Sequence, residues 1–483
     1  MSDTPYDQYE TVIGLEAHVQ LSTRSKAFCA DAVVFGADPN TRVSPVSLGE
    51  PGTLPRLNAA QVAAAVRLGL ALDCEINPRS YFDRKNYSYV DLPKGFQTTQ
   101  DAQPICIGGA VTLPEAVGGR TIRLHHIHME EDAGKSIHDQ RPTHSLVDLN
   151  RAGTPLLEIV TEPDFRSAAE VEAFMYAMRH LVRWLKVGDG NMEQGSLRCD
   201  CNVSVRKPGA PFGTRCEVKN MNSMKFARRA IEFERKRQID LLEAGGTVVQ
   251  STLNFDPTTG RTSPLRSKED AHDYRYFPEP DLPPVIITEQ ALARAQAELP
   301  ELPEALRNRL RTDHGLSDYD VAQLTEERPV AQYYLALLAA GANAKPAANL
   351  VINKLKPFWQ SAELAPAATP VPHAGLVALL ALVKDDKISH TVAYGQLWEL
   401  LMAQPEADPA ALAAQHALLQ QDDDAALRTL AQAVLADHPG KVAAYRKGKK
   451  GLIGFFMGEL MKRAKGQAPP AKAKAVLGEL LEV

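Results

Sequence analysis

The sequence predicts an α+β fold, an antiparallel-sheet domain followed by helical regions. Up to about residue 290, short segments of alternating apolar and polar residues are separated by turns rich in Pro, Gly, Asn and Asp, which is typical of antiparallel strands. Helical patterns are interspersed without a repeating strand–helix–strand unit, which favours α+β over α/β. From about Ile287 onward the chain becomes rich in Ala and Leu at helical spacing.

The first part of the chain contains expected strands and helices in a definite order. Strands are expected at 11–21, 121–132, 156–162, 197–205 and 216–220, where apolar and polar side chains alternate. Helices are expected at 59–72, 168–185 and 223–246, where apolar residues recur at helical spacing. Ser167 is a suitable N-cap for the second helix, and Gly245 and Gly246 end the third. The segment 361–372, rich in Pro and Ala, is the expected linker in the helical part.

The composition limits the class of protein. Of 483 residues, 44% are hydrophobic and 23% charged, as in ordinary soluble globular proteins, and the length suggests about three domains. No apolar run reaches the ~18 residues of a transmembrane helix. The acidic, polar N-terminus does not resemble a targeting peptide, and six Cys are too few for a disulfide framework. We expect a cytoplasmic protein with reduced thiols and no membrane partner.

The charge is unevenly distributed. Residues 440–483 contain ten Lys and Arg against three Glu, a net charge of +7, so the rest of the chain carries −12 of the total of −5. A basic tail on an acidic body indicates contact with a polyanion. The alternative is a solvated, Lys-rich surface helix without a partner.

The segment 11–21 places chemically active side chains on one face of a strand. Gly14, Glu16, His18 and Gln20 alternate with apolar residues. Side chains two positions apart lie roughly 6.5–7 Å from each other, so Glu16 and His18 stand side by side. For this segment alone, the alternative is an edge strand with a solvated polar face.

The same alternation recurs in the other expected strands. Their polar faces carry Glu158 and Glu162; Arg198, Asp200 and Asn202; Glu217 and Lys219; and His126, His128 and Glu130. Glu131 falls on the opposite face of its strand, together with Met129. If the strands share one sheet, its apolar face packs on the helices, and the other face is a concave surface of acidic, basic and imidazole groups.

Such a surface has a chemical use. Crowded carboxylates raise one another's pKa values unless a cation joins them, and oxygen-rich ligands with one imidazole suit Mg²⁺ or Mn²⁺ better than a structural zinc. Flanking Arg and Lys complement the phosphates of a nucleotide. The pattern predicts a metal–nucleotide site, and the alternative is an exposed sheet face with ion pairs.

Other motifs are weaker. GKS at 134–136 lacks the earlier glycine of a P-loop. His126 and His128 form an HxH pair without a third soft ligand at a set spacing, and His126 is interpreted as a hydrogen-bonded strand histidine. Cys199 and Cys201 share the apolar face, which favours buried, inert thiols. No hydrolytic nucleophile pattern appears, so the chain is not expected to hydrolyse an amide itself.

Two loop segments are dense in polar side chains of the kinds found in binding sites. The segment 82–100 has Arg84, Lys85 and Lys94 around a Leu-Pro turn. The segment 266–284 is equally rich in charge, and a salt-bridged connector between domains is its alternative.

Many of these segments together resemble one family. GLEAHVQL, SKAFC, PGTLPRLN, FDRKNYSYVDLPKGFQ, HMEEDAGKS, VDLNRAGTPLLEIV, MEQGSLRCDCNVSV, EVKNMNS and RSKEDAHDYRYFPEPDLPP closely resemble motifs of the GatB family, the B subunits of aspartyl/glutamyl-tRNA amidotransferases. The segment RKGKKGLIGFFMGELMKRAKGQAPP is similar to the YqeY-like tail of that family. The resemblance runs in order from about Tyr9 to Leu481.

The resemblance implies a fold and a reaction. It implies a cradle catalytic domain with an antiparallel sheet similar to that of glutamine synthetase at 1–292, an all-α helical domain at 293–405 and an α-helical YqeY-like tail at 406–483. The family's amidase partner, GatA, releases ammonia from glutamine, and a small partner, GatC, completes the complex. The GatB protein uses Mg-ATP to phosphorylate the side-chain carboxylate of Glu mischarged on tRNA(Gln) or of Asp mischarged on tRNA(Asn). Ammonia then displaces the phosphate.

The resemblance also implies site residues by motif position. Implied catalytic residues are Glu16, His18, Glu131 and Glu158. Implied Mg²⁺ ligands are Glu16, His18, Glu130, Glu131, Glu158 and Asp200. Implied contacts to ATP or the substrate are Arg84, Lys85, Lys94, Arg198 and Lys219. Implied contacts to tRNA phosphates are Lys447, Lys449, Lys450, Lys462 and Lys465, whose affinity should fall with salt.

The chain departs from the family pattern in two places. Some relatives carry four zinc-binding Cys, where this chain has Cys29, Asp31, Ser44 and Ser47, so no structural zinc is expected. Gln194 replaces a common Glu, so a ligand role is not assigned to that position.

Two other functions compete with the ATP-dependent amidotransferase component. One is a noncatalytic tRNA-binding scaffold whose acidic sheet face is structural. The other is a free-standing ligase similar to glutamine synthetase, against which the basic tail argues. Glu-tRNA(Gln) and Asp-tRNA(Asn) are both open as substrates.

Overall fold

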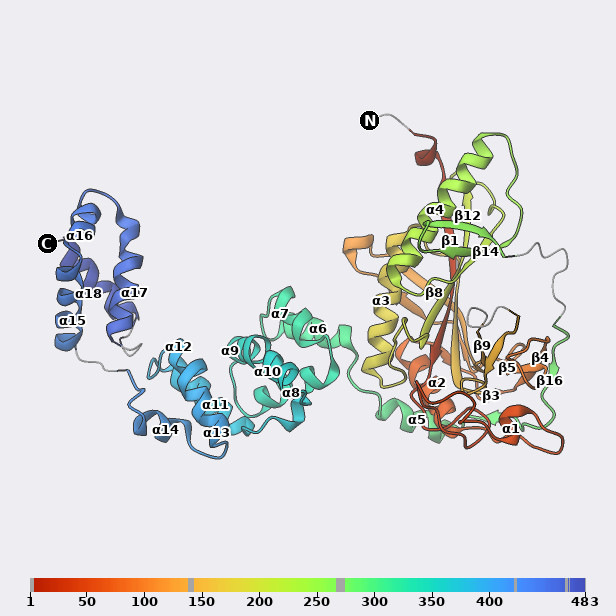
Figure 1. The fold of residues 1–483 in the computed structure, drawn as a ribbon, viewed down its shortest axis with the longest axis horizontal. Helices are drawn as coiled ribbons and strands as arrows, with labels where there is room; N and C mark the ends of the chain where they lie inside the picture. The colour runs from red at the N-terminus through yellow and green to blue at the C-terminus, as the bar shows by residue number, and fades with distance from the viewer. Residues whose placement is uncertain are drawn as a thin grey trace. The chain divides into compact units, whose positions relative to one another are not determined.

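The computed structural model describes residues 4–137, 143–265, 274–420, 424–464, 468 and 470–482 (Figure 1). The chain divides into two compact units, Met1–Pro303 and Glu304–Val483, which are described separately. Every strand among the described residues belongs to the first unit, so the fold is a mixed α+β one with a large sheet and many helices.

A ten-stranded sheet forms the centre of the first unit (Figure 1). Its strand order is β15-β14-β13-β12-β1-β11-β8-β6-β2, and β7 also pairs with β8. The bounds are β1 Glu10–Gln20, β2 Glu75–Ile76, β6 Cys106–Ile107, β7 Ala110–Thr112, β8 Thr121–Glu131, β11 Pro155–Thr161, β12 Leu197–Arg206, β13 Cys216–Lys219, β14 Thr252–Asp256 and β15 Arg261–Pro264. The five strands expected to carry the polar face are therefore neighbours in one sheet.

One pair of strands corrects the expectation of a purely antiparallel sheet. Strands β13 and β14 are parallel. Between them the chain forms the helix α4 (Met224–Glu243), and a long crossover of this kind is what parallel neighbours require. The sheet is therefore mixed, although all its other pairings are antiparallel.

Helices cover the apolar face of the sheet, as the alternation predicts. Helix α4 packs on β12 and against α3 (Ala168–Trp184), while α2 (Ala59–Ala71) packs on β8 (Figure 1). Side chains that point to this face, such as Ile13, Leu15, Ala17, Val19, Cys199 and Cys201, are buried. Ser167 accepts a hydrogen bond from the Glu170 amide at 3.2 Å, which confirms the expected N-cap.

Smaller strands flank the main sheet. A three-stranded sheet joins β4 (Asp83–Asn86), β5 (Phe96–Thr99) and β16 (Phe277–Pro278), and β5 lies against β8. Strand β3 (Arg79–Ser80) pairs with β17 (Val285–Ile286), and β9 (Lys135–Ile137) pairs with β10 (Leu146–Asp148). Short helices lie at η1 (Pro5–Gln8), α1 (Pro45–Leu48) and η2 (Glu115–Val117), and α5 (Glu289–Ala297) packs on α2. The β4–β5 hairpin brings the segment 82–100 to the end of β8.

The second unit contains helices only, within its described residues. They are α6 (Pro303–Thr312), α7 (Asp318–Leu324), α8 (Arg328–Ala339), α9 (Ala344–Leu350), α10 (Lys356–Ser361), α11 (His373–Lys384), α12 (His390–Val392), α13 (Trp398–Ala403), α14 (Pro409–Gln415), α15 (Asp424–Asp437), α16 (Pro439–Arg446), α17 (Ile453–Arg463) and α18 (Pro470–Glu482). The π-helical segments Val351–Leu355 and Ala393–Leu397 join α9 to α10 and α12 to α13, and short 3₁₀ turns form at Pro366–Ala368 and Lys450–Leu452. The expected linker 361–372 lies between α10 and α11.

The last four helices share an apolar core of their own, which includes buried Phe456, Leu460 and Leu477. No helix in the described ranges is long and apolar enough to cross a bilayer.

Candidate functional site

The strand register places three predicted site residues, His18, Glu158 and Arg198, in one row across the sheet together with His128. His18 of β1 pairs with Arg198 of β12 on one side and with Glu158 of β11 on the other. Glu158 pairs in turn with His128 of β8. Side chains directly opposite on neighbouring strands lie about 4.5–5.5 Å apart at Cβ, so these groups contact one another.

His18, Glu130 and Glu158 form a compact cluster within this row and the next. The Nε2 atom of His18 lies 3.3 Å from Oε2 of Glu158 and 3.6 Å from Oε1 of Glu130. One ligand atom from each residue lies within 4.8 Å of the others. Two carboxylates and one imidazole are a donor set that suits Mg²⁺ or Mn²⁺. These three residues, called the metal cluster below, fit the expected ion.

The electrostatics of the metal cluster call for a positive charge. Burial opposes protonation of His18, but the carboxylates of Glu158 and Glu130 raise its pKa to about 9. Burial likewise opposes ionisation of Glu158, yet the two neighbouring imidazoles hold its pKa well below the usual range. The paired carboxylates therefore need a cation between them, which either a protonated His18 or a divalent ion supplies.

A line of three histidines approaches the metal cluster from the side of β8. Nε2 of His128 lies 3.3 Å from Oε2 of Glu158 and 3.7 Å from Oε2 of Glu130. Its Nδ1 is 3.0 Å from Nε2 of His126, whose Nδ1 is 2.7 Å from Nδ1 of His125. Burial and the flanking imidazoles lower the pKa of His126 to about 4, so this ring is neutral at neutral pH. The interpretation of His126 as a hydrogen-bonded strand histidine is confirmed.

Glu16 and Asp200, which the family motifs also implied as ligands, lie opposite each other one row further along. Asn202 donates to Oε1 of Glu16 at 3.0 Å. Lys219 donates to Asp200 at 2.5 Å and pairs with Glu217 at 2.7 Å. Burial raises the pKa of Glu16, and the charges of Glu158 and Glu217 raise it further. Neither residue belongs to the group whose ligand atoms meet within 4.8 Å.

Glu131 lies on the other side of β8 from Glu130. Its carboxylate pairs with the ammonium of Lys94 and accepts the Thr98 amide at 2.9 Å. Because successive side chains of a strand point to opposite faces, Glu131 is separated from the metal cluster. Gln97 links the two sides, since its amide donates to Oε2 of Glu130 at 3.0 Å and to the carbonyl of Glu131 at 2.8 Å.

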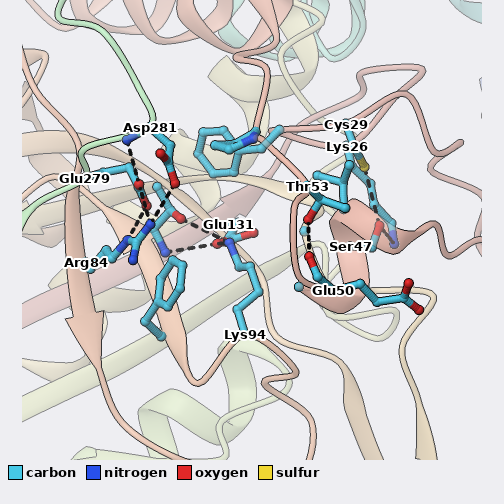
Figure 2. Close-up of a pocket in the computed structure, with 17 residues that line it drawn as sticks. Lys26, Cys29, Ser47, Glu50, Thr53, Arg84, Lys94, Glu131, Glu279 and Asp281 are labelled. Atoms are coloured by element: carbon cyan, nitrogen blue, oxygen red, sulfur yellow. Dashed lines mark hydrogen bonds and ion pairs between the residues drawn. The ribbon is translucent and has the colours of Figure 1, made fainter.

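Glu131 and Lys94 line a cavity of about 170 Å³, called the Lys94 pocket below (Figure 2). Arg84 also lines it but is held by Glu279, with N–O distances of 2.7 and 2.8 Å, and by Asp281 at 3.1 Å. Other lining residues are Lys26, Phe28, Cys29, Val46, Ser47, Gly49, Glu50, Thr53, Pro55, Phe96, Thr98 and Gly153. Lys85 is not among them, and its Nζ lies 4.9 Å from the centre of the Tyr274 ring. The pocket thus combines cations, carboxylates and aromatic rings.

The region aligned with a family zinc site has a different donor set. The Cys29 thiol lies 3.4 Å from the Ser47 hydroxyl, which donates to Asp31. The ammonium of fully buried Lys26 lies 3.4 Å from the same hydroxyl and 4.0 Å from Asp31. A single thiol beside a lysine does not match the four thiolate or imidazole ligands of a structural zinc. These residues therefore do not fit that ion.

Arg198 is oriented by an acidic residue that the sequence interpretation did not select. Its Nη2 donates to Asp132 at 2.9 Å, and Asp132 also accepts from Gln20 at 2.8 Å. Burial opposes the ionisation of Asp132, but Arg198 and Arg151 lower its pKa. The Nε atom of Arg198 is buried without a hydrogen-bond partner among the described residues. Both Asp132 and Gln97 lie within motifs that resemble the family, HMEEDAGKS and FDRKNYSYVDLPKGFQ, and this is the sequence signal for them.

The expected tRNA-binding lysines of the second unit lie on its surface. Lys447, Lys449, Lys450 and Lys462 are exposed, and Nζ of Lys450 lies 4.4 Å from the centre of the Tyr445 ring. Lys465 lies outside the described residues, as does the part of the charged segment at 266–273.

Comparison with known proteins covers nearly the whole chain. Residues 11–293 match the family model described as the GatB/GatE catalytic domain, and residues 332–481 match the one described as the GatB domain. The chain is 49% identical over 480 residues to a protein of Anaeromyxobacter sp. (strain Fw109-5), covering 98% of this chain and 99% of that one. It is 46% identical over 475 residues to a protein of Hydrogenovibrio crunogenus, covering 98% of this chain and all of that one. Both relatives are named as the B subunit of aspartyl/glutamyl-tRNA(Asn/Gln) amidotransferase.

Proposed function

The chain belongs to the GatB family and functions as the B subunit of a tRNA-dependent amidotransferase, and from this premise we propose how its site takes part in the reaction. The proposed reaction is ATP-dependent phosphorylation of the side-chain carboxylate of Glu-tRNA(Gln), Asp-tRNA(Asn) or both, followed by amidation with ammonia. A carboxylate is a poor acyl donor because oxide is a very poor leaving group. Phosphate is a far better one once its charge is neutralised.

The observation that carries the proposal is the metal cluster. His18, Glu130 and Glu158 would hold Mg²⁺, and they converge from three adjacent strands rather than from one flexible loop. When bound, the ion would neutralise phosphate charge. Phosphoryl transfer depends mostly on positioning and on such neutralisation. Glu16 and Asp200 lie in the adjacent row of the sheet and Glu131 lies on the other side of β8, and we propose all three as secondary contacts to ions or substrate.

The proposed contacts to ATP and the substrate carboxylate are cations that already have acidic partners. Lys94 pairs with Glu131, Arg84 with Glu279, Arg198 with Asp132 and Lys219 with Asp200. These pairings keep the cations ordered before an anion arrives, which lowers the entropic cost of binding it. Lys85, held over the Tyr274 ring, is the fifth of this set.

Membership of the GatB family suggests how the domains and the partners of this chain are organised. We propose a cradle domain similar to that of glutamine synthetase at 1–292, an all-α helical domain at 293–405 and a YqeY-like tail at 406–483. We propose a heterotrimer with the glutamine-hydrolysing amidase GatA and the small partner GatC, acting in the cytoplasm. The exposed lysines of the tail would contact tRNA phosphates, so that binding weakens as salt is raised. A noncatalytic scaffold is not favoured, because it gives the converging ligands of the metal cluster no use.

The test uses the complex reconstituted from this chain, GatA and GatC, with each mischarged tRNA. His18→Ala should abolish ATP hydrolysis and transamidation, while the affinity for tRNA stays as in the wild type. His144→Ala, at an exposed histidine away from the metal cluster, is the matched control and should remain active. If turnover is unchanged in His18→Ala, the scaffold function is correct and the catalytic proposal is wrong.

A further inference from the structure

The three histidines of β8, called the histidine chain below, form a continuous line of hydrogen bonds. His125 is exposed, His126 is half-buried, and His128 is buried against the metal cluster. The ring centres of His126 and His128 are 5.1 Å apart, and the facing nitrogens are 3.0 Å apart. These distances place the joined nitrogens between the two rings, as in a direct N–H···N bond.

The buried end of the histidine chain determines the direction in which its hydrogen bonds are donated. Ionised carboxylates only accept hydrogen bonds, so Nε2 of His128 must donate to Glu158. When all three rings are neutral, as expected once a divalent ion offsets the charge of the carboxylates, Nδ1 of His128 accepts from Nε2 of His126, and Nδ1 of His126 accepts from His125. Each ring thus sets which nitrogen of the next one carries the proton, and every donor points toward the metal cluster.

The two carboxylates of the metal cluster depend on this line to different degrees. Glu130 is also held by the Gln97 amide at 3.0 Å. Glu158 contacts His18 and His128 within the described part of the chain, and both contacts are made by its Oε2 atom. His18 is itself a proposed metal ligand, so His128 is the group left to orient Glu158 once an ion is bound.

We propose that His126 is a positioning residue of the amidotransferase site, which acts through His128 to hold the Glu158 carboxylate in its ion-binding orientation. The inference rests on the proposed function, because it takes the metal cluster to be the Mg²⁺ site. His126 contacts neither the carboxylates of the metal cluster nor His18, so its effect is transmitted by the tautomer and orientation of His128. Partners that orient a ligating carboxylate in this way commonly change metal affinity by about 10- to 100-fold.

The test measures Mn²⁺ binding to the full chain by the electron paramagnetic resonance signal of free Mn²⁺. His126→Leu, which fills similar space without a polar atom, should weaken binding roughly 10-fold, the low end of the range for lost outer partners. His126→Gln should restore most of the affinity, because a neutral amide can both donate and accept. His125→Leu should have a smaller effect than His126→Leu, and His144→Leu, at an exposed histidine outside the chain, should have none.

The controls separate failure of this inference from failure of the proposed function. If His18→Ala binds Mn²⁺ as tightly as the wild type, the metal cluster is not the ion site and the proposed function fails. If His18→Ala loses binding while His126→Leu retains it, the metal site stands and the positioning role of His126 is wrong. Equal loss in His126→Leu and His126→Gln, with unchanged thermal unfolding, also overturns it, because the hydrogen bond then does not matter.

Discussion

Replacing Lys26 by methionine is expected to stabilise the first unit. Lys26 is fully buried, and the contacts that its ammonium makes within the described residues are long, at 3.4 Å to the Ser47 hydroxyl, 3.4 Å to the Leu149 carbonyl and 4.0 Å to Asp31. Good N–H···O bonds are about 2.7–3.2 Å long, so these contacts offset little of the cost of removing a charge from water. Methionine has a similar length and no charge.

The size of the stabilisation depends on which hydrogen bonds remain after Lys26 is replaced. Asp31 still accepts from Ser47 when Lys26 is gone, so no carboxylate is left without a partner. Apolar replacement of a buried ion pair is often neutral or stabilising by about 1–4 kcal/mol, and we expect about 1 kcal/mol here. Asp31→Asn should act in the opposite direction, by about 1–3 kcal/mol, because it removes the carboxylate paired with the buried ammonium.

The stability gained by Lys26→Met should change with pH. Burial lowers the pKa of Lys26 below 10.5, despite the nearby Cys29, Asp31 and Glu131. As pH rises from the folded-state pKa toward 10.5, the unfolded chain holds the proton that the folded chain has lost, so the wild type gains stability. The advantage of Lys26→Met is therefore largest near neutral pH and shrinks in alkaline solution.

The measurement is native-state hydrogen exchange of β1 and β8 peptides by mass spectrometry, which reports the free energy of opening of the first unit. Lys135→Met, at an exposed lysine, is the matched control and should stay within about 0.5 kcal/mol of the wild type. A loss of more than about 1 kcal/mol in Lys26→Met at neutral pH would refute the reasoning, because the loose pair would then be net stabilising.

Other substitutions test separate parts of the chain. Ser167→Ala removes the N-cap hydrogen bond from the Glu170 amide and should lower the free energy of opening of α3, measured by hydrogen exchange, by about 1 kcal/mol. Ser167→Asp should remain close to the wild type. Burial raises the pKa of Asp320, but hydrogen bonds and the charge of Lys345 lower this pKa overall. The stability that ionised Asp320 contributes is therefore present above the unfolded-state pKa of about 3.8 and is lost as pH falls through the folded-state pKa. Asp320→Asn should remove that acid dependence in urea unfolding of the second unit. Lys450→Gln should reduce the salt slope of tRNA binding by about 0.7–0.9, and an unchanged slope would exclude a phosphate contact.

The shared polar face could be predicted from the sequence because alternation decides which side chains lie on the same side of a strand. Alternation does not decide which residues of two strands face each other, since register depends on the whole sheet. The pairing of His18 with Glu158 therefore emerged only from the structure. For the same reason, only the structure shows that ligand atoms of His18, Glu130 and Glu158 lie within 4.8 Å of one another while Glu16 lies in the adjacent row.

Other features depend on contacts between segments that are far apart in the sequence. Gln97 is an ordinary strand residue until the β4–β5 hairpin lies against β8, and only then does its amide reach Glu130. The parallel pairing of β13 with β14 was missed because a single crossover helix in an otherwise antiparallel pattern does not change the local periodicity. The helices at 59–72, 168–185 and 223–246 were confirmed with ends within a few residues, since caps and apolar spacing are local properties.

The neighbouring residues Glu130 and Glu131 connect two sites that lie on opposite faces of β8. Glu130 belongs to the metal cluster, and the next residue, Glu131, lines the Lys94 pocket. The Gln97 amide donates to the carboxylate of Glu130 and to the backbone carbonyl of Glu131. The two sites on opposite faces of β8 therefore share one hydrogen-bonding side chain, Gln97, and a change at either site alters the surroundings of the same amide.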